Sequence, residues 1–276
     1  MKFINKKNKG FALKANIIVD AFIKGQRKKG KECKYFLFLN TPYKNKLQDV
    51  LIAEQQEKCC YCMRRLTHDN ITIEHVIPKS AGEVVVNTYL KKKNVVFRQV
   101  KYEKNLKVFV YPPYPHPIAY GNLCVSCKGI LKEGTESSFS CNCKRKDAMI
   151  TPLIFMPDIK NKIEYMGISG EVRLRQPDSN NTLDKLGLNN ETLKEIRFIW
   201  ALTAKNRSRI LIKRDRKYDF LFNIFHVRAL KELRKLGLSA FEKYFVSPDD
   251  YYWKLLKEYD WFYYYFKKKK IIRNIL

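Results

Sequence analysis

Two groups of cysteine residues carry the clearest metal-binding signal in the chain. Cys59 and Cys62 are separated by two residues, a spacing that lets both sulfurs reach one tetrahedral ion. A second pair must come from elsewhere, and four more cysteines are available: Cys124, Cys127, Cys141 and Cys143. Their polar surroundings, such as Cys-Asn-Cys-Lys-Arg-Lys, do not favour thiols packed as small buried hydrophobes. The pattern predicts a structural zinc ion.

A Glu-His pair, Glu74-His75, lies between the two cysteine groups at the end of a β-branched segment. Among the 4 histidines of the chain, only this one stands in a Glu-His-x-x-Pro-Lys context. Asn122 follows a proline-rich turn, and Asn142 stands directly beside Cys141, where a helix-capping role is the alternative. A neutral imidazole is the natural general base near pH 7, and carboxylate and amide oxygens are ligands of hard cations.

In this order the residues resemble an HNH, or ββα-metal, endonuclease. The matching motifs are Cys59-x-x-Cys62, Ile73-Glu74-His75-Val76-Ile77-Pro78-Lys79-Ser80, Tyr120-Gly121-Asn122-Leu123, Ser126-Cys127 and Cys141-Asn142. Within that superfamily the chain is most similar to the nuclease subunit of Septu-type and related retron-associated bacterial antiphage systems. That similarity extends through Thr151-Pro152-Leu153 and the segment from Leu186 to Arg197, so it covers about residues 40–200.

The chemistry of such a site can be stated in physical terms. Hydrolysis of a phosphodiester requires a base that activates water and a cation that stabilises charge on the phosphate and the leaving oxygen. We expect His75 to be the base, and Glu74 and Asn142 to hold one Mg²⁺ or Mn²⁺ ion. The resemblance implies that Asn122 fixes the loop that orients His75. Strict alternation would send Glu74 and His75 to opposite faces, unless the strand ends or bulges near Pro78.

The resemblance also selects the zinc ligands, which are Cys59, Cys62, Cys127 and Cys141. This choice leaves Asn142 directly after a ligand. Two alternatives stay open, because Cys124-x-x-Cys127 is itself a knuckle spacing and Cys143 can replace Cys141.

A strongly basic composition points to a polyanionic partner. The chain has 276 residues, with 55 Lys or Arg against 27 Asp or Glu and a formal net charge of +28. The excess is spread along the chain, which suits nucleic acid because each neutralised phosphate releases counterions. Lys79, Lys144 and Arg145 flank the motifs and are the expected contacts. Phosphate contacts look alike for both nucleic acids, and we expect DNA rather than RNA.

Several elements must position these residues. A helix is expected from Pro42 to Gln56, with Thr41 as its N-cap, and a strand from Ile71 to Ile77 that Pro78 stops. The stretch from Ser80 to Tyr114 is expected to be an inserted hairpin or a long loop. A further helix is expected from Asn190-Glu191 to Lys205.

The C-terminal pattern is mostly helical and basic, including Phe220 to Leu236 and Tyr251 to Phe266. The aromatic runs of the second segment favour core packing or a protein interface over base stacking. The sequence thus predicts an α+β protein with three parts: a basic segment at 1–39, a zinc-braced nuclease module at 40–160 with an insertion at 81–117, and a mainly helical basic region at 161–276. No apolar segment resembles a signal peptide or a membrane span, so we expect a cytoplasmic location with reduced thiols and no membrane partner.

The expected function is metal-dependent endonucleolytic cleavage of nucleic acid in bacterial antiphage defence. By resemblance, a separate ATPase subunit is the partner, docked by the insertion or by residues 251–276. One alternative is an RNA-cleaving toxin, for example one that acts on tRNA. Another is a zinc-stabilised nucleic-acid-binding subunit without catalysis, although a pure binder needs neither a base nor an open metal site.

Overall fold

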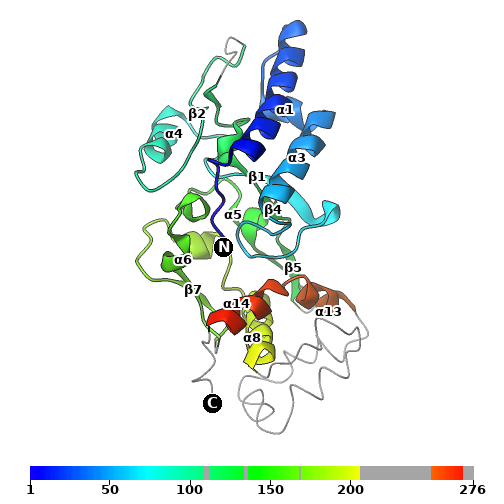
Figure 1. Cartoon of the computed structure of the whole chain (residues 1–276), viewed down its shortest axis with the longest axis vertical. Coiled ribbons are helices and arrows are strands. Elements are labelled where there is room, and N and C mark those ends of the chain that lie inside the picture. The colour runs from blue at the N-terminus through cyan, green and yellow to red at the C-terminus, as the bar shows by residue number, and fades with distance from the viewer. Residues whose placement is uncertain (108–111, 134–135, 168, 206–249, 270–276) are drawn as a thin grey trace. The chain divides into compact units, whose positions relative to one another are not determined.

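The computed structural model describes residues 1–107, 112–133, 136–167, 169–205 and 250–269. The chain contains helices and small two-stranded sheets that do not alternate regularly, which confirms the predicted α+β class (Figure 1). The chain divides into two units. Unit 1 comprises residues 1–130, 139–163 and 174–187, and unit 2 comprises 131–138, 164–173 and 188–276. Unit 1 therefore joins the basic N-terminal segment to the expected nuclease module.

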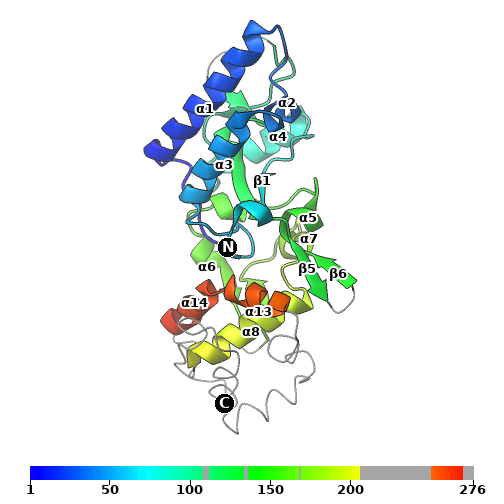
Figure 2. The same ribbon diagram turned by 90° about the vertical axis from the view of Figure 1, so that its right-hand side faces the viewer.

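Unit 1 begins with three helices, α1 (Lys9–Lys28), α2 (Tyr35–Leu39) and α3 (Pro42–Glu54). α1 and α3 lie side by side, as Figures 1 and 2 both show. The stripe of Ala15, Val19 and Phe22 is buried because these residues recur at helical spacing on one face of α1. α3 starts after Thr41 with proline at its first position, as predicted.

The central sheet of unit 1 pairs β1 (Ile71–His75) with β4 (Leu123–Cys127) in antiparallel register. The two strands run from Ile71 opposite Cys127 to His75 opposite Leu123, and every residue of β4 is buried. This pairing brings one zinc-ligand candidate, at the end of β4, to the start of β1. It places the Glu-His pair at the other end of the sheet.

β1 ends at His75, two residues before the predicted boundary. The amide of Val76 donates to the carbonyl of Asn122 at 3.0 Å, and the amide of Ile77 donates to the Asn122 side chain at 2.7 Å. These two residues therefore bond to the turn before β4 and not to the strand ladder.

In its described residues, the insertion holds a helix and a pair of parallel strands, and not the expected hairpin or long loop. Residues 83–90 form the helix α4 (Glu83–Leu90), and β2 (Val100–Lys101) pairs in parallel with β3 (Tyr114–Pro115). Val86 and Tyr89 are buried on one side of α4, and the Tyr89 hydroxyl donates to the Ile150 carbonyl at 2.8 Å. Val84, Val85 and Val86 form a run of valines that favours a strand, and tertiary packing has overridden this preference. Residues 108–111 of the insertion lie outside the described residues.

The remaining short elements belong to unit 1 or lie where the chain passes from one unit to the other. They are η1 (His68–Asn70), η2 (Tyr120–Asn122), β5 (Ile130–Glu133), β6 (Glu136–Phe139), α5 (Cys141–Arg145), η3 (Leu153–Phe155), α6 (Ile159–Lys162), β7 (Ile163–Tyr165), β8 (Val172–Leu174) and α7 (Thr182–Lys185). Among the described residues, no helix combines the length and apolar character that crossing a membrane requires.

Unit 2 is built on three described helices: α8 (Glu191–Lys205), α13 (Asp250–Lys257) and α14 (Trp261–Lys269). Asn190 caps α8 by accepting the Leu193 amide at 2.9 Å. The Trp200 indole donates to the Leu256 carbonyl at 3.0 Å, and Phe262 is fully buried. These aromatic residues thus form a core, and deleting residues 251–276 would remove it. The predicted helix at 220–236 lies outside the described residues.

Candidate functional site

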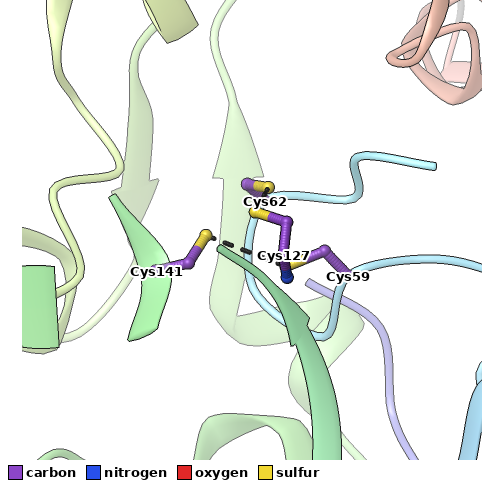
Figure 3. A group of neighbouring side chains, drawn as sticks. All are labelled: Cys59, Cys62, Cys127 and Cys141. Carbon is purple, nitrogen blue, oxygen red and sulfur yellow. Dashed lines mark hydrogen bonds between the residues drawn. The ribbon is translucent and has the colours of Figure 1, made fainter. Parts of the chain in front are cut away.

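Four cysteine sulfurs of unit 1 converge on one point (Figure 3). The ligand atoms of Cys59, Cys62, Cys127 and Cys141 all lie within 4.8 Å of one another, and all four residues are buried. The Cys59 and Cys141 sulfurs are 3.7 Å apart, and those of Cys62 and Cys127 are 3.6 Å apart. Zn–S bonds of about 2.3 Å give tetrahedral edges of about 3.8 Å, so the four sulfurs fit a zinc ion.

The local backbone explains why these sulfurs meet. The loop of Cys59 and Cys62 closes on itself through the Met63 amide, which donates to the Cys59 carbonyl at 3.2 Å. Cys141 arrives from far along the chain because Gly129 adopts a positive φ of 71° and lies against the backbone of residue 140. A side chain on Gly129 would stand 1.9 Å from the Ser140 carbonyl oxygen, so only glycine permits this approach.

Cys124 and Cys143, the other two candidate ligands, do not belong to the cluster. Cys124 contacts Cys60, with their sulfurs 3.6 Å apart, and Cys143 is partly exposed outside the cluster. Burial raises the pKa of the Cys59 thiol, but hydrogen bonds from Cys127 and Cys141 outweigh it and hold that pKa well below its ordinary value. A thiolate is the form that binds zinc. The positions of the four sulfurs therefore allow the cluster to hold a structural zinc ion, through the set that the resemblance selected.

An open pocket of about 100 Å³ lies at the other end of the β1–β4 sheet. Residues from four segments line it: Tyr35, Ile73, Glu74, His75, Lys79, Asn142, Lys146 and Asp147. Glu74 and His75 both line it, and they are the last two residues of β1. Asn142 reaches it from α5, next to the cysteine cluster.

His75 is held as a neutral imidazole. Its Nε2 lies 2.9 Å from the Pro117 carbonyl oxygen, which only accepts, so Nε2 carries the proton and Nδ1 keeps its lone pair. Burial lowers the pKa of His75 to about 4, while the Pro117 carbonyl acts in the opposite direction. The Tyr35 ring meets the imidazole edge-on, with centroids 4.3 Å apart. At pH 7 this side chain can accept a proton.

Asn122 holds the two segments that flank His75. Its buried side-chain amide donates to the carbonyls of Ile77 and His116, each at 2.9 Å, and its oxygen accepts the Ile77 amide. Ile77 lies two residues after His75, and His116 directly precedes Pro117, whose carbonyl contacts the His75 ring. Asn122 therefore bonds to both segments that hold the imidazole. This geometry suits an orienting role rather than contact with a reacting atom.

We expect Asn122→Ala to lower the free energy of unfolding by about 3 kcal/mol, because three buried backbone groups lose their partner. Urea denaturation of the zinc-loaded chain measures this. Asn189→Ala is the matched control. The Asn189 side chain accepts the Val172 amide and donates to the Val172 carbonyl in unit 2, as Asn122 does with Ile77. If only the Asn122 variant also loses Mn²⁺ affinity, Asn122 organises the pocket; equal affinity in both would reduce it to a stabilising residue.

Glu74 is a buried carboxylate in an ion pair. Its Oε1 accepts hydrogen bonds from the Tyr61 hydroxyl at 3.1 Å and from the Arg145 guanidinium. Glu74 is also among the residues that line the pocket. Burial raises the pKa of Glu74 to about 7, while Arg145 acts to lower it.

Asn142 has its side-chain orientation set by β1. Its amide nitrogen donates to the Thr72 hydroxyl at 3.1 Å, and that hydroxyl contacts Ser126 at 3.2 Å. Asn142 is also among the residues that line the pocket. Asp147, which accepts from Ser80 at 3.1 Å, adds a carboxylate to the same lining.

The expected nucleic-acid contacts have different positions. Lys79 is exposed and lines the pocket, and Lys144 is exposed on α5. Arg145 corrects the sequence-based expectation, because it is only 2% exposed and its guanidinium bonds to the protein interior. Lys146, which the sequence analysis did not select, lines the pocket one residue further on.

Two other lining residues were missed. Asp147 stands five residues after Asn142, and its nearness in sequence was an available signal. Tyr35 had no such signal, because its segment is remote from the motifs and reads only as basic and apolar. Its place in the pocket comes from the packing of α2.

No family model matches the chain, and neither the curated proteins nor the solved structures contain a significant match. The fold and the site define the class. The chain is an α+β protein with a buried four-cysteine cluster that can hold a metal such as zinc. In the same unit, it carries a polar pocket that is lined by a neutral histidine, two carboxylates and two lysines.

Proposed function

We propose that this protein is a metal-dependent endonuclease of the HNH type that cleaves nucleic acid, DNA in preference to RNA. The observation that carries the proposal is the convergence of Glu74, His75 and Asn142 on one pocket. They come from the end of β1 and from α5, the helix that begins at a cysteine of the cluster. A base and two oxygen ligands at one opening match the needs of phosphodiester hydrolysis.

His75 is the proposed general base. Its Nδ1 takes a proton from the attacking water, and the positive charge that develops on the ring is stabilised by the Pro117 carbonyl at Nε2. The hydrogen bond to this carbonyl keeps the imidazole in one orientation. Lys79 and Lys146 bind the phosphate from the pocket rim, and Lys144 adds charge nearby.

The oxygen donors of the pocket fit a hard divalent cation such as Mg²⁺ or Mn²⁺. Glu74 Oε2 and the Asn142 oxygen are the expected ligands, and Asp147 adds a third donor to the lining. When bound, the cation supplies charge stabilisation to the phosphate and the leaving oxygen. Few protein ligands leave positions for phosphate and water, in contrast to the closed four-thiol site.

Cation binding should depend on pH through Glu74. Because burial raises the Glu74 pKa to about 7, the carboxyl takes up a proton below that pH and no longer offers a charged ligand. His75, with a pKa of about 4, stays neutral over the same range and does not contribute. We expect Mn²⁺ affinity to fall about tenfold for each pH unit below 7. Mn²⁺ titrations followed by electron paramagnetic resonance test this, and a pH-independent affinity would contradict it.

Antiphage defence with an ATPase partner completes the proposal, on the strength of the sequence resemblance. A strongly cationic nuclease binds any nucleic acid at hand, so control by a partner protects the host. The aromatic residues of α13 and α14 are largely buried, which favours the 81–117 insertion as the docking segment.

Incubating the purified chain with plasmid, single-stranded DNA and RNA, in Mg²⁺ or in EDTA, tests the activity. Cleavage of DNA that EDTA abolishes is the expected result, while cleavage restricted to RNA would make the protein an RNA-cleaving effector.

A non-catalytic nucleic-acid-binding subunit is the second candidate. The buried Glu74–Arg145 ion pair favours it, because this pair already neutralises the carboxylate. Binding of all three substrates without any cleavage, with or without the ATPase subunit, would select this candidate.

A further inference from the structure

Arg145 is the most extensively bonded side chain near the pocket, yet it does not line the pocket. Its three guanidinium nitrogens make five hydrogen bonds to the protein: to the Ala148, His75 and Val76 carbonyls, to the Tyr61 hydroxyl and to the Glu74 carboxylate. The bond to the His75 carbonyl is 2.7 Å long and that to the Val76 carbonyl is 2.8 Å. One buried side chain thus bonds to the carboxylate of Glu74 and to the backbone carbonyl of His75.

The other end of this contact is anchored at the cysteine cluster. Arg145 is the last residue of α5, and Cys141, a member of the cluster, is the first. Asn142 lies between them and lines the pocket. The helix therefore links the cysteine cluster to the end of β1, and Arg145 is the side chain that bonds to the end of β1.

We infer that Arg145 is a positioning residue that sets the geometry of the pocket by fixing the Glu74 carboxylate and the backbone of His75 and Val76. This inference rests on the proposed function and adds a residue to it. A planar guanidinium with five donors can bond several acceptors at fixed angles, whereas a lysine ammonium offers three rotatable donors at one point. Arg145→Lys keeps the positive charge but removes the planar array of donors. The variant therefore separates the effect of charge from the effect of hydrogen-bond geometry.

The expected effect appears in cation affinity and in turnover. Replacing groups that orient metal ligands typically weakens metal affinity or activity by about 10–100-fold. We expect Arg145→Lys to weaken Mn²⁺ binding and to lower kcat by such a factor, with KM for DNA and zinc content unchanged. Arg197→Lys is the matched control. Arg197 is also buried and bonds the Gly170 and Leu188 carbonyls, but it belongs to unit 2.

Hydrogen exchange supplies a readout that needs neither cation nor substrate. Peptides that cover residues 73–79 should exchange faster in Arg145→Lys than in the wild type and in Arg197→Lys, while peptides from α1 stay unchanged. This measurement tests the contact even if the chain cleaves nothing, so failure of the inference and failure of the proposed function are distinguishable.

Three results would overturn the inference. Unchanged hydrogen exchange at residues 73–79 would show that the Arg145 guanidinium does not stabilise the end of β1. A raised KM with a reduced salt dependence would make Arg145 a phosphate contact. A uniform loss of stability, with Mn²⁺ affinity unchanged in the folded chain, would make its role structural only.

Discussion

Cys127→Ser and Cys59→Ser are expected to yield insoluble or metal-free protein, and the wild-type chain is expected to carry one tightly held zinc. Four thiolates form a closed site, and the binding free energy of such sites, about 10–16 kcal/mol, is also folding energy. In this chain the cluster joins the Cys59–Cys62 loop, the end of β4 and the start of α5. Its loss removes the support of the pocket as well.

Zinc content by mass spectrometry, with solubility and circular dichroism, measures this effect. Cys124→Ser is the matched control, because Cys124 is also buried in β4 but contacts Cys60 and not the cluster. Cys143→Ser is a second control. Brief chelation should leave the zinc bound while it removes the catalytic cation. Normal solubility and full activity of the Cys59 and Cys127 variants would refute the zinc site, and metal loss in Cys143→Ser without loss in Cys141→Ser would move it by two residues.

His75→Ala is expected to abolish cleavage while zinc content, folding and nucleic-acid affinity stay near wild type. A general base contributes about 10²–10⁴-fold to the rate, and in the described part of the chain His75 is the only histidine that lines the pocket. Within the described residues its side chain contacts the Pro117 carbonyl and the Tyr35 ring, so we expect its removal to leave the sheet and the cluster in place.

Initial rates on plasmid DNA at saturating Mg²⁺ provide the measurement, and filter binding reports affinity. His68→Ala is the control, because His68 is exposed on η1 at the opposite end of β1. A His75→Ala chain that cuts at the wild-type rate would show that another group activates the water.

Local elements were largely predictable. Pro42 after Thr41 marks the start of α3, and Asn190 caps α8 as its position before Glu191 indicated. Such signals act within a few residues of backbone, so they survive without tertiary information. The α4 helix was not predictable in the same way, since its valine run prefers strands and the burial of Val86 decides its conformation.

The choice among the cysteines shows where local reasoning stops. Spacing identified the Cys59–Cys62 pair, but the second pair stayed open among four residues until a family resemblance selected two. The structure places Cys127 and Cys141 in the cluster because Gly129 lets the backbone of residue 140 approach closely. That approach depends on the path of the chain after β4, which no short-range pattern encodes.

The sequence by itself determined the chemistry that is available: the thiols, the Glu-His pair, the asparagines, the cationic charge and the α+β class. Only the tertiary structure decided which of these groups meet. It buried Arg145 against Glu74 and turned an expected phosphate contact into an internal ion pair. It also brought Tyr35 against His75. The physical reason is that burial and contact depend on segments far apart in the chain, while residue type and spacing record only what each segment can offer.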